Sequence, residues 1–328
     1  MKYRTLGTHP ETRREVSVLS LGAMLFGTTT DETTSYAILD RYVEAGGTFV
    51  DTANNYAYWI NGTQGGESES LLGRWRRAHG VGDEVVIATK LAGRPLQPRT
   101  ALTTETEGLS AAVIRESSAR SAERLGVSKL DLLYAHIGDS RTPLEETVGA
   151  FGALVAEGNV GLLGASNHWS WRVERSRQLA ASAGLAPYEV LQYHHTYARQ
   201  RTDLRTRHSP DGELGVAAGD ILDYVRHDPA LTLVAYSPLL SGAYVRDDRP
   251  LGHEHDHAGT PARLEALREV AAETGATPNQ VVLSWLIGGE VPVIPLVGAS
   301  SVAQLDESLA AVDLELTADQ RARLDAAE

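Results

Sequence analysis

The 328-residue chain contains no cysteine. It therefore forms no disulfide bond and offers no thiolate nucleophile and no sulfur ligand for a structural zinc or an iron–sulfur cluster. No apolar run approaches the ~18 residues that span a bilayer, and the first residues do not continue into the apolar segment of a signal peptide. We therefore expect a soluble, cytoplasmic protein without a membrane partner.

Positive charge is also scarce. Lys and Arg total 30 against 43 Asp and Glu, which leaves a formal net charge of −13, and no basic block occurs. Such a chain repels phosphate backbones, so nucleic acid is not an expected partner. Only three of the basic residues are lysines: Lys2, Lys90 and Lys129. Because arginine supplies most of the positive charge, a lysine at the end of an apolar segment, as Lys90 is, becomes a candidate for amine chemistry.

Short apolar segments alternate with longer amphipathic ones along the whole chain. Several short segments are apolar on successive residues, which is typical of strands buried on both faces of a parallel sheet. The expected strands are Val18–Gly22, Thr48–Ala53, Val85–Lys90, Leu130–His136, Gly161–Ser166, Val190–Tyr193, Leu231–Tyr236 and Val291–Leu296. The helical periodicity predicts helices over Ser35–Ala45, Glu67–Arg77, Ser110–Leu125, Leu144–Ala156, Trp171–Ala183, Gly215–Val225, Pro261–Thr274, a helix opened by Thr277-Pro278, Val302–Ala311 and Thr317–Asp325.

Eight strands alternating with helices, without a linker or composition break, predict an α/β protein with one domain over residues 1–328, a (β/α)8 TIM barrel. The segment before Val18 is expected to form a hairpin that closes the bottom of the barrel, and extra helices end the chain. A doubly wound sheet would need a Gly-x-Gly-x-x-Gly turn after its first strand, and none is present. Residues 245–260 are predicted to form a long surface loop.

Ionisable side chains occur where three successive strands end: Asp51, Lys90 and His136, with Tyr56 in the loop after the first of them. Adjacent strands lie about 4.8 Å apart, so these groups can meet at the mouth of the barrel. A phenol with a pKa of about 10 is a weak acid, but a cationic lysine beside it lowers that pKa, and a carboxylate keeps the lysine charged. The histidine can orient a carbonyl oxygen. None of these groups is a strong nucleophile, so the chemistry requires a cofactor.

The chain resembles the aldo-keto reductase family in three segments: Asp51-Thr-Ala-Asn-Asn-Tyr56, Ala88-Thr-Lys90 and Tyr134-Ala-His136. The resemblance implies a catalytic tetrad of Asp51, Tyr56, Lys90 and His136, with Tyr56 as general acid. It also implies hydride transfer between NADPH/NADP+ and a small-molecule aldehyde or ketone.

The same resemblance extends over nearly the whole chain and implies the cofactor contacts. Ser166 and Asn167, joined by Gln192, would hold the nicotinamide carboxamide. Tyr236 would stack on the ring, and the turn Ser237-Pro238-Leu239 would hold the pyrophosphate. The further contacts implied are Gly22, Ala23, Met24, Asp51, Ser241, Gly242, Arg263, Gly298, Ser300, Gln304, Glu307 and Ser308.

Two segments depart from the family pattern. Many members carry a cation after the eighth strand for the adenosine 2′-phosphate, whereas residues 298–301 are neutral here. This version resembles the branch that contains potassium-channel β subunits, and makes Arg246, Arg249 and Arg263 in and after the seventh-strand loop the candidate cations. The stretch 57–64 is longer than expected, and either places Tyr58 and Trp59 over the substrate or is an ordinary surface loop.

Three hypotheses stay open besides the reductase. Lys90 as a Schiff-base nucleophile would make the protein an aldolase. A non-catalytic subunit that binds NADP(H) and regulates a partner is a second alternative. The third concerns His253, His255 and His257, whose alternation permits a zinc site, although a hydrated loop without metal is the expectation. The sequence is compatible with a homo-oligomer and does not identify the substrate.

Overall fold

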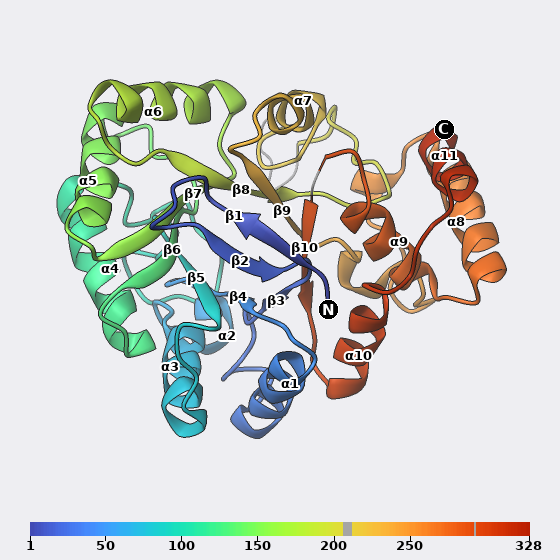
Figure 1. The fold of residues 1–328 in the computed structure, drawn as a ribbon, viewed down its shortest axis with the longest axis horizontal. Helices are drawn as coiled ribbons and strands as arrows, with labels where there is room; N and C mark the ends of the chain where they lie inside the picture. The colour runs from blue at the N-terminus through green and yellow to red at the C-terminus, as the bar shows by residue number, and fades with distance from the viewer. Residues whose placement is uncertain (206–211, 292) are drawn as a thin grey trace.

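The computed structural model describes residues 1–205, 212–291 and 293–328, and Figure 1 shows their arrangement. Eight parallel strands form a closed barrel in the order β10-β3-β4-β5-β6-β7-β8-β9, which confirms the predicted TIM barrel. The strands are β3 (Ser20–Gly22), β4 (Phe49–Asp51), β5 (Val86–Leu91), β6 (Leu130–Ala135), β7 (Val160–Ser166), β8 (Tyr188–His194), β9 (Thr232–Tyr236) and β10 (Val293–Gly298). Each matches an expected strand, and residue 292 of the last expected strand lies outside the described residues.

Helices surround the barrel (Figure 1). They are α1 (Glu32–Glu44), α2 (Tyr58–Asn61), α3 (Glu67–His79), α4 (Ala111–Leu125), α5 (Leu144–Ala156), α6 (Ser170–Ser182), α7 (Gly219–His227), α8 (Thr260–Thr274), α9 (Pro278–Ile287), α10 (Val302–Ala310) and α11 (Ala318–Ala326). Only the four-residue α2 was not expected. Thr277 and Thr317 both form capping boxes, each with a glutamine three residues later, as the sequence indicated for the starts of α9 and α11. Among the described residues, no helix is long and apolar enough to cross a membrane.

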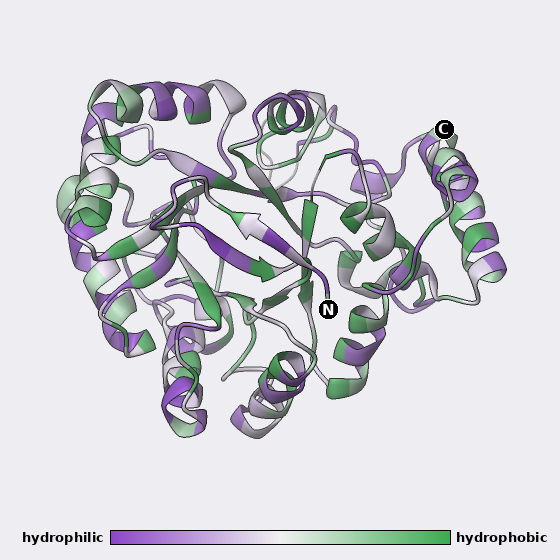
Figure 2. Ribbon diagram, viewed as in Figure 1, coloured by the Kyte–Doolittle hydropathy of each residue, from purple (hydrophilic) through white to green (hydrophobic). Residues whose placement is uncertain are grey.

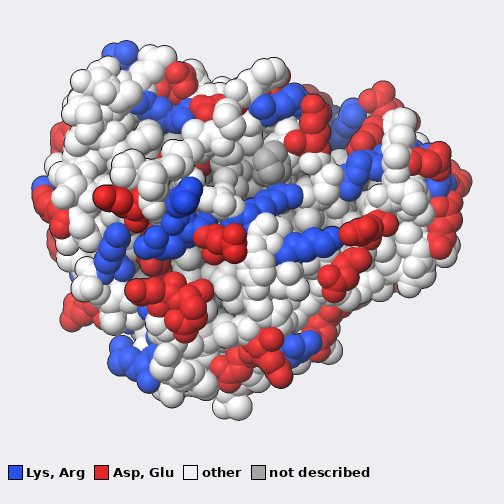
Figure 3. Space-filling model, in the orientation of Figure 1, with Lys and Arg blue, Asp and Glu red and all other residues white. Residues whose placement is uncertain are grey.

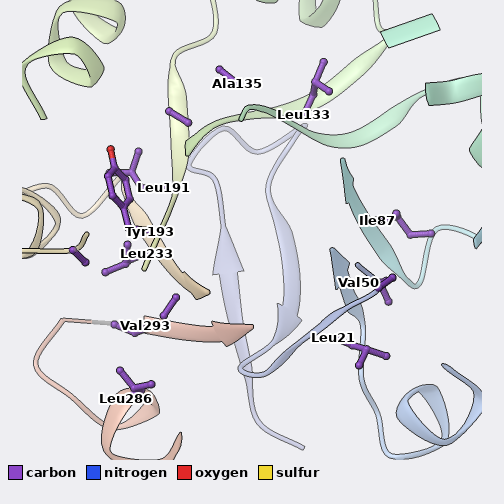
Figure 4. Close-up of a cluster of buried hydrophobic side chains, with 14 of the residues drawn as sticks. Leu21, Val50, Ile87, Leu133, Ala135, Leu191, Tyr193, Leu233, Leu286 and Val293 are labelled. Carbon is purple, nitrogen blue, oxygen red and sulfur yellow. The ribbon is translucent and has the colours of Figure 1, made fainter. Parts of the chain in front are cut away.

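Two apolar cores lie on opposite faces of the strands. Outward side chains such as Val50, Ile87 and Leu133 pack against the helices (Figure 4). Inward side chains such as Phe49 and Leu132 fill the barrel interior. Colouring by hydropathy shows mostly apolar barrel strands and amphipathic helices, whereas the two N-terminal strands over residues 3–6 and 14–17 carry polar residues (Figure 2). Burial on both faces is why the barrel strands appeared as continuous apolar runs in the sequence.

The N-terminal hairpin closes one end of the barrel, as predicted. It consists of β1 (Tyr3–Leu6) and β2 (Arg14–Ser17), which pair antiparallel and cross the centre of the barrel in Figure 1. Leu6 and Val16 enter the inner core from this side. The view of this face in Figure 3 shows both signs of charge interspersed over it. The hairpin leaves the opposite end, where the strands terminate, as the end with open loops.

Candidate active site

Strand alternation directs a layer of polar side chains into the upper barrel. On β5, Ile87 and Leu91 face the helices, so Lys90 faces inward, as Ala88 does. The register pairs Lys90 with Tyr134 on β6, and Asp51 with Gly22 on β3. The parallel order of the strands therefore brings the polar side chains at the carboxyl ends together at one end of the barrel interior, here called the chamber.

Asp51 and Lys90 form a fully buried ion pair at the centre of this chamber, each 0% exposed. Besides Asp51 Oδ1, the Lys90 ammonium donates to the Thr52 carbonyl oxygen at 2.7 Å and to the Tyr56 hydroxyl oxygen at 2.8 Å. These three acceptors match the three N–H donors of an ammonium group. These contacts hold Lys90 Nζ in one orientation, facing the phenol, while burial lowers the pKa of the Lys90 ammonium from its usual value and the Asp51 carboxylate opposes that lowering.

Tyr56 lies on the segment after β4, and its hydroxyl contacts both members of the ion pair. Its hydroxyl donates to Asp51 Oδ1 at 3.3 Å. The segment is fixed from behind, because Asn54 Nδ2 donates to Glu107 Oε1 at 2.7 Å and the Ala92 backbone N–H donates to the same oxygen at 2.9 Å. Glu107 therefore ties the ends of β4 and β5 together, a role that its place in a polar loop gave no means of predicting.

The pKa of the Tyr56 phenol differs from what the sequence led us to expect. Burial, followed by the nearby Asp51 carboxylate, raises the pKa of the Tyr56 phenol well above its usual value. The expectation that Lys90 produces a net lowering of that pKa is therefore wrong for this structure. Lys90 is not among the causes of this shift, and the Tyr56 phenol is neutral throughout the ordinary pH range.

His136 completes the predicted set of four converging side chains. Its ring lies edge-on to Tyr56, with centroids 5.9 Å apart and an interplanar angle of 80°. Burial, Lys90 and His168 lower the pKa of His136 to about 3, so its imidazole is neutral. Its Nδ1 atom is buried without a partner among the described residues. The chamber thus contains a neutral imidazole whose ring lies against that of Tyr56.

The residues implied to hold a nicotinamide lie next to this set. Asn167 Nδ2 donates to the His136 carbonyl oxygen at 3.1 Å and to Ser166 Oγ at 3.0 Å. The Tyr236 hydroxyl donates to Asn167 Oδ1 at 2.9 Å. Gln192 Nε2 donates to Asp51 Oδ2 at 2.8 Å, which connects this amide group to the ion pair. Tyr236 therefore donates a hydrogen bond from its hydroxyl in addition to offering the face of its ring.

The residues implied to hold the phosphates of the cofactor follow a path along the ends of β9 and β10. In the turn after β9, Ser237, Leu240 and Ser241 have φ values of 53°, 48° and 57°, strained conformations that concentrate at binding sites. Pro238, Leu239 and Gly242 belong to the same turn. At the end of β10, a Cβ atom on Gly298 would have no neighbour within 4 Å. Ser300 and Gln304 lie at the start of α10, where the Ser300 backbone N–H and hydroxyl both donate to Gln304 Oε1 at 2.9 Å and the Gln304 backbone N–H donates to Ser301 Oγ at 3.3 Å.

Arg263 does not lie free on this path. It is 4% exposed, its Nε donates to the Tyr197 carbonyl oxygen at 2.9 Å, and its Nη1 donates to the Ala327 carbonyl oxygen at 3.0 Å. The guanidinium also lies 4.3 Å from the Tyr197 ring centroid. We therefore correct the expectation for Arg263: it anchors the C-terminal end of the chain, because its Nε and Nη1 atoms donate to backbone carbonyls inside the protein.

The remaining cofactor candidates have varied surroundings. The Ala23 backbone N–H donates to the Asp51 carbonyl oxygen at 2.9 Å, and the neighbouring Met24 is 41% exposed, so the end of β3 borders the chamber. Glu307 is turned toward α9, where its Oε1 accepts from Thr277 Oγ1 at 2.8 Å. Ser308 is 5% exposed on α10.

The stretch 57–64 is not an ordinary surface loop, because it contains α2. Tyr58 is 2% exposed, and its hydroxyl accepts from the Thr103 backbone N–H at 3.2 Å. Trp59 is partly exposed and lies edge-on to Tyr58, with centroids 5.2 Å apart. Of the two aromatics predicted over the substrate, Tyr58 thus packs against the loop after β5 and only Trp59 has a free surface.

The three histidines of the loop before α8 point to different partners. His255 is 2% exposed, with its ring 5.9 Å from that of His194. His257 Nδ1 accepts from the Gly259 backbone N–H at 3.0 Å, and the His253 side chain is 79% exposed. No three His, Cys, Asp or Glu side chains of the described ranges are grouped to hold a metal ion.

Buried neutral histidines predict loss of stability in acid. Burial lowers the pKa of His168 to about 4, as it does for His195, and that of His136 to about 3. Below pH ~6.5 the unfolded chain binds protons that the folded chain does not, so the free energy of unfolding falls by at most about 1.4 kcal/mol per pH unit for each such group. Urea unfolding between pH 7 and 4.5 measures this fall in the free energy of unfolding.

His168→Gln should make the free energy of unfolding less dependent on pH. The control H227Q removes a histidine whose side chain is 71% exposed and should not change that dependence. Parallel curves for H168Q and wild type would contradict the prediction.

The fold and site define a TIM-barrel enzyme with a buried lysine–carboxylate pair and a phenol at the mouth. Residues 18–328 match the Aldo/keto reductase family, and the chain belongs to that family. It is 30% identical to the "Uncharacterized oxidoreductase YrpG" of Bacillus subtilis, over 96% of this chain and 92% of the relative. It is 28% identical to "Norsolorinic acid reductase A" of Aspergillus parasiticus (98% and 81%) and 30% identical to "Aldo-keto reductase str7" of Strobilurus tenacellus (90% and 81%). The chain is therefore an oxidoreductase by family.

Proposed function

We propose that the protein reduces a small-molecule aldehyde or ketone with NADPH, and that Tyr56 is the general acid. The observation that carries the proposal is the shared contact in which the Lys90 ammonium binds Asp51 and the Tyr56 oxygen inside a buried chamber. Such a group can release a proton to a neighbouring oxygen while the ammonium stabilises the phenolate that is left. Because a chain without cysteine has no disulfide bond to form in an oxidising compartment, we place the reaction in the cytoplasm.

The mechanism assigns one task to each side chain. When bound, the cofactor would supply a hydride to the carbonyl carbon, and Ser166, Asn167 and Gln192 would hold its carboxamide. The neutral His136 ring orients the carbonyl oxygen toward the Tyr56 hydroxyl. Tyr56 gives the proton of its hydroxyl to the carbonyl oxygen, which completes the alcohol. Lys90 and Asp51 hold the phenol oxygen in place during this transfer.

The geometry disfavours the Schiff-base alternative. A lysine nucleophile needs a neutral amine with a free lone pair. Lys90 Nζ instead faces three acceptors and is 0% exposed. The non-catalytic alternative leaves the proton donor unexplained, because cofactor binding alone does not require a phenol between an ammonium and an open chamber.

The proposed function is tested by following NADPH consumption with a panel of aldehydes and ketones. We expect NADPH to be consumed with at least one of these carbonyl compounds, and not in the absence of a carbonyl compound. Tight binding of NADPH with no turnover across the panel would favour the regulatory subunit instead. Trapping of a carbonyl on Lys90 by borohydride would favour the aldolase.

Cofactor preference depends on the remaining loop arginines. Arg246 lies against the turn after β9, since a Cβ on Gly242 would be 2.9 Å from its Cδ, and it is paired with Asp248. A charge-assisted hydrogen bond to phosphate contributes about 1.5–3 kcal/mol, or roughly 10- to 150-fold in affinity. We expect NADPH to bind more tightly than NADH by this factor in fluorescence titrations.

The variants Arg246→Gln and Arg249→Gln identify which side chain provides the preference. The responsible variant should bring the NADPH affinity close to that of NADH while leaving NADH affinity unchanged. R226Q, which removes an arginine in the last turn of α7 that is paired with Glu290, is the matched control. Equal affinities of the wild type for the two cofactors would show that the neutral residues 298–301 leave the 2′-phosphate unrecognised.

A further inference from the structure

Glu69 is a buried carboxylate that the proposed mechanism does not use. It lies in the first turn of α3 and is 0% exposed. Its Oε1 accepts a hydrogen bond from Thr89 Oγ1 at 2.6 Å, and its Oε2 accepts one from Arg124 Nη1 at 2.8 Å. Thr89 directly precedes Lys90 on β5. Because successive residues of a strand face opposite sides, Thr89 faces α3 while Lys90 faces the chamber.

The residue before it on α3, Ser68, makes a similar contact on the other side of the ion pair. Ser68 Oγ donates to the Ala23 carbonyl oxygen at 2.7 Å and lies 2.7 Å from Thr52 Oγ1. Since a hydroxyl has one proton to donate, Thr52 Oγ1 is the donor between the two hydroxyls. Thr52 directly follows Asp51, and its carbonyl oxygen accepts from Lys90 Nζ at 2.7 Å. Two consecutive residues of α3 therefore bind the chain neighbours of both charges.

Two glycines leave space for the guanidinium that balances Glu69. A Cβ atom on Gly66, the N-cap of α3, would lie 2.7 Å from Cζ and Nε of Arg124. A Cβ atom on Gly73, one turn after Glu69, would overlap the Arg124 carbonyl oxygen, so this glycine lets α3 and α4 approach closely. The buried carboxylate thus has a cation and a hydroxyl as partners, as a buried charge requires.

Packing does not explain these polar contacts. Thr52, Ser68, Glu69 and Thr89 are each 0% exposed, and apolar side chains would cover the strands without burying a charge. Replacing a buried ion pair by well-packed apolar residues is often neutral or stabilising. A hydrogen bond adds direction, because it holds its two partners within a narrow range of distance and angle. Here that direction is imposed on the residues next to the catalytic ion pair.

We propose that Ser68 and Glu69 are positioning residues of the catalytic ion pair. Ser68 acts through Thr52 and Glu69 acts through Thr89, so α3 sets the positions of the ends of β4 and β5. The ammonium of the pair is thereby kept at hydrogen-bond distance from the phenol oxygen that gives up the proton. A misplacement of about 1 Å at a reacting group can lower a rate about 10²-fold. The kinetic part of this inference rests on the proposed function.

The first test compares Thr89→Val, which removes the hydroxyl, with Thr89→Ser, which keeps it. For T89V we expect kcat and kcat/KM for carbonyl reduction to fall together by about 5- to 50-fold, with NADPH affinity changed less than about twofold. T89S should recover most of the rate, because its hydroxyl still donates to Glu69. A T89V rate within about twofold of wild type would overturn the inference, and so would a loss that T89S fails to recover.

Thr147→Val is the matched control for this comparison. Thr147 lies on α5, is 2% exposed, and donates its hydroxyl to the Leu109 carbonyl oxygen at 3.0 Å. T147V therefore also removes a buried threonine hydroxyl, but on a different helix, and kcat should stay within about twofold of wild type. An equal fall in T147V and T89V would show a general effect of losing a buried hydroxyl and would overturn the inference.

The second test does not depend on turnover. The urea midpoint of unfolding is measured for wild type and T89V, and again after Lys90→Met, Asp51→Asn has removed both charges of the pair. Interacting groups give non-additive changes, so the loss of midpoint caused by T89V should be at least halved in the background without the pair. Equal losses in the two backgrounds would overturn the inference, because the hydrogen bond to Glu69 would then stabilise only its own surroundings.

The two tests separate this inference from the proposed function. If the wild type reduces no carbonyl, the proposed function fails, while the urea comparison still decides whether Glu69 acts on the ion pair through Thr89. If the variant without the pair does not fold, the rates of T89V, T89S and T147V decide alone.

Discussion

Tyr56→Phe is expected to lower kcat for carbonyl reduction by about 10²–10⁴-fold, the usual consequence of losing a general acid. The substitution removes one oxygen and keeps the ring that lies 4.7 Å from Lys90 Nζ and 5.9 Å from the His136 ring. The fold should therefore survive, and NADPH affinity should change little. Single-turnover oxidation of NADPH with a carbonyl that the wild type reduces measures the chemical step directly.

Two comparisons make the Tyr56 result specific. H136A should retain more activity than Y56F, because it misplaces the carbonyl and leaves the proton donor. A kcat of Y56F within roughly threefold of wild type would show that the acid is another group. In that case, an inactive Lys90→Met variant would move the Schiff-base hypothesis to first place.

The barrel could be predicted because its physical signal is local. Strands buried on both faces give apolar runs, and helices packed on one face give a 3.6-residue period, so all eight strands were recognised. The short α2 could not be predicted in the same way, since its four residues are too few to show a period. Its tyrosine is buried by contact with residue 103, which is far away in the sequence.

The convergence of Asp51, Lys90 and His136 could also be predicted, because the ends of adjacent parallel strands meet whatever the details of packing. The burial of single side chains could not. Arg263 has the helical surroundings of an exposed arginine, and only contacts with the backbone of residues 197 and 327 reveal its role. Likewise, the pKa of Tyr56 depends on the burial of the finished chamber, which no neighbouring residue in the sequence specifies.

Tyr134 and Gly164 illustrate a signal that was present but could not be interpreted. Both residues are visible in the sequence, but their relation depends on strand register, which places them on adjacent strands and on the same face. A glycine in a strand indicates a close approach of some other group, without saying which one. Here the approaching group is the phenol ring, 2.4 Å from the position of the missing Cβ.

Lys90→Met should abolish activity and also destabilise the protein. Both partners of the ion pair are 0% exposed, so the substitution leaves the Asp51 carboxylate buried without its cation. Removing one partner of a buried pair typically costs about 3–5 kcal/mol. Without the ammonium, nothing stabilises the phenolate of Tyr56, so kcat should fall by about 10²–10⁴-fold as well. Urea unfolding at pH 7 and single-turnover NADPH oxidation measure the two effects separately.

The double variant Lys90→Met, Asp51→Asn separates the two roles of the lysine. Replacing both charges removes the uncompensated carboxylate, and Gln192 and Tyr56 still find a polar group at position 51, so most of the lost stability should return. The rate should not return, because the relay needs the ammonium beside the phenol oxygen. Recovery of both stability and rate would mean that Lys90 acts only through the fold. If neither recovered, the carboxylate would have a role of its own in the chamber beyond balancing Lys90.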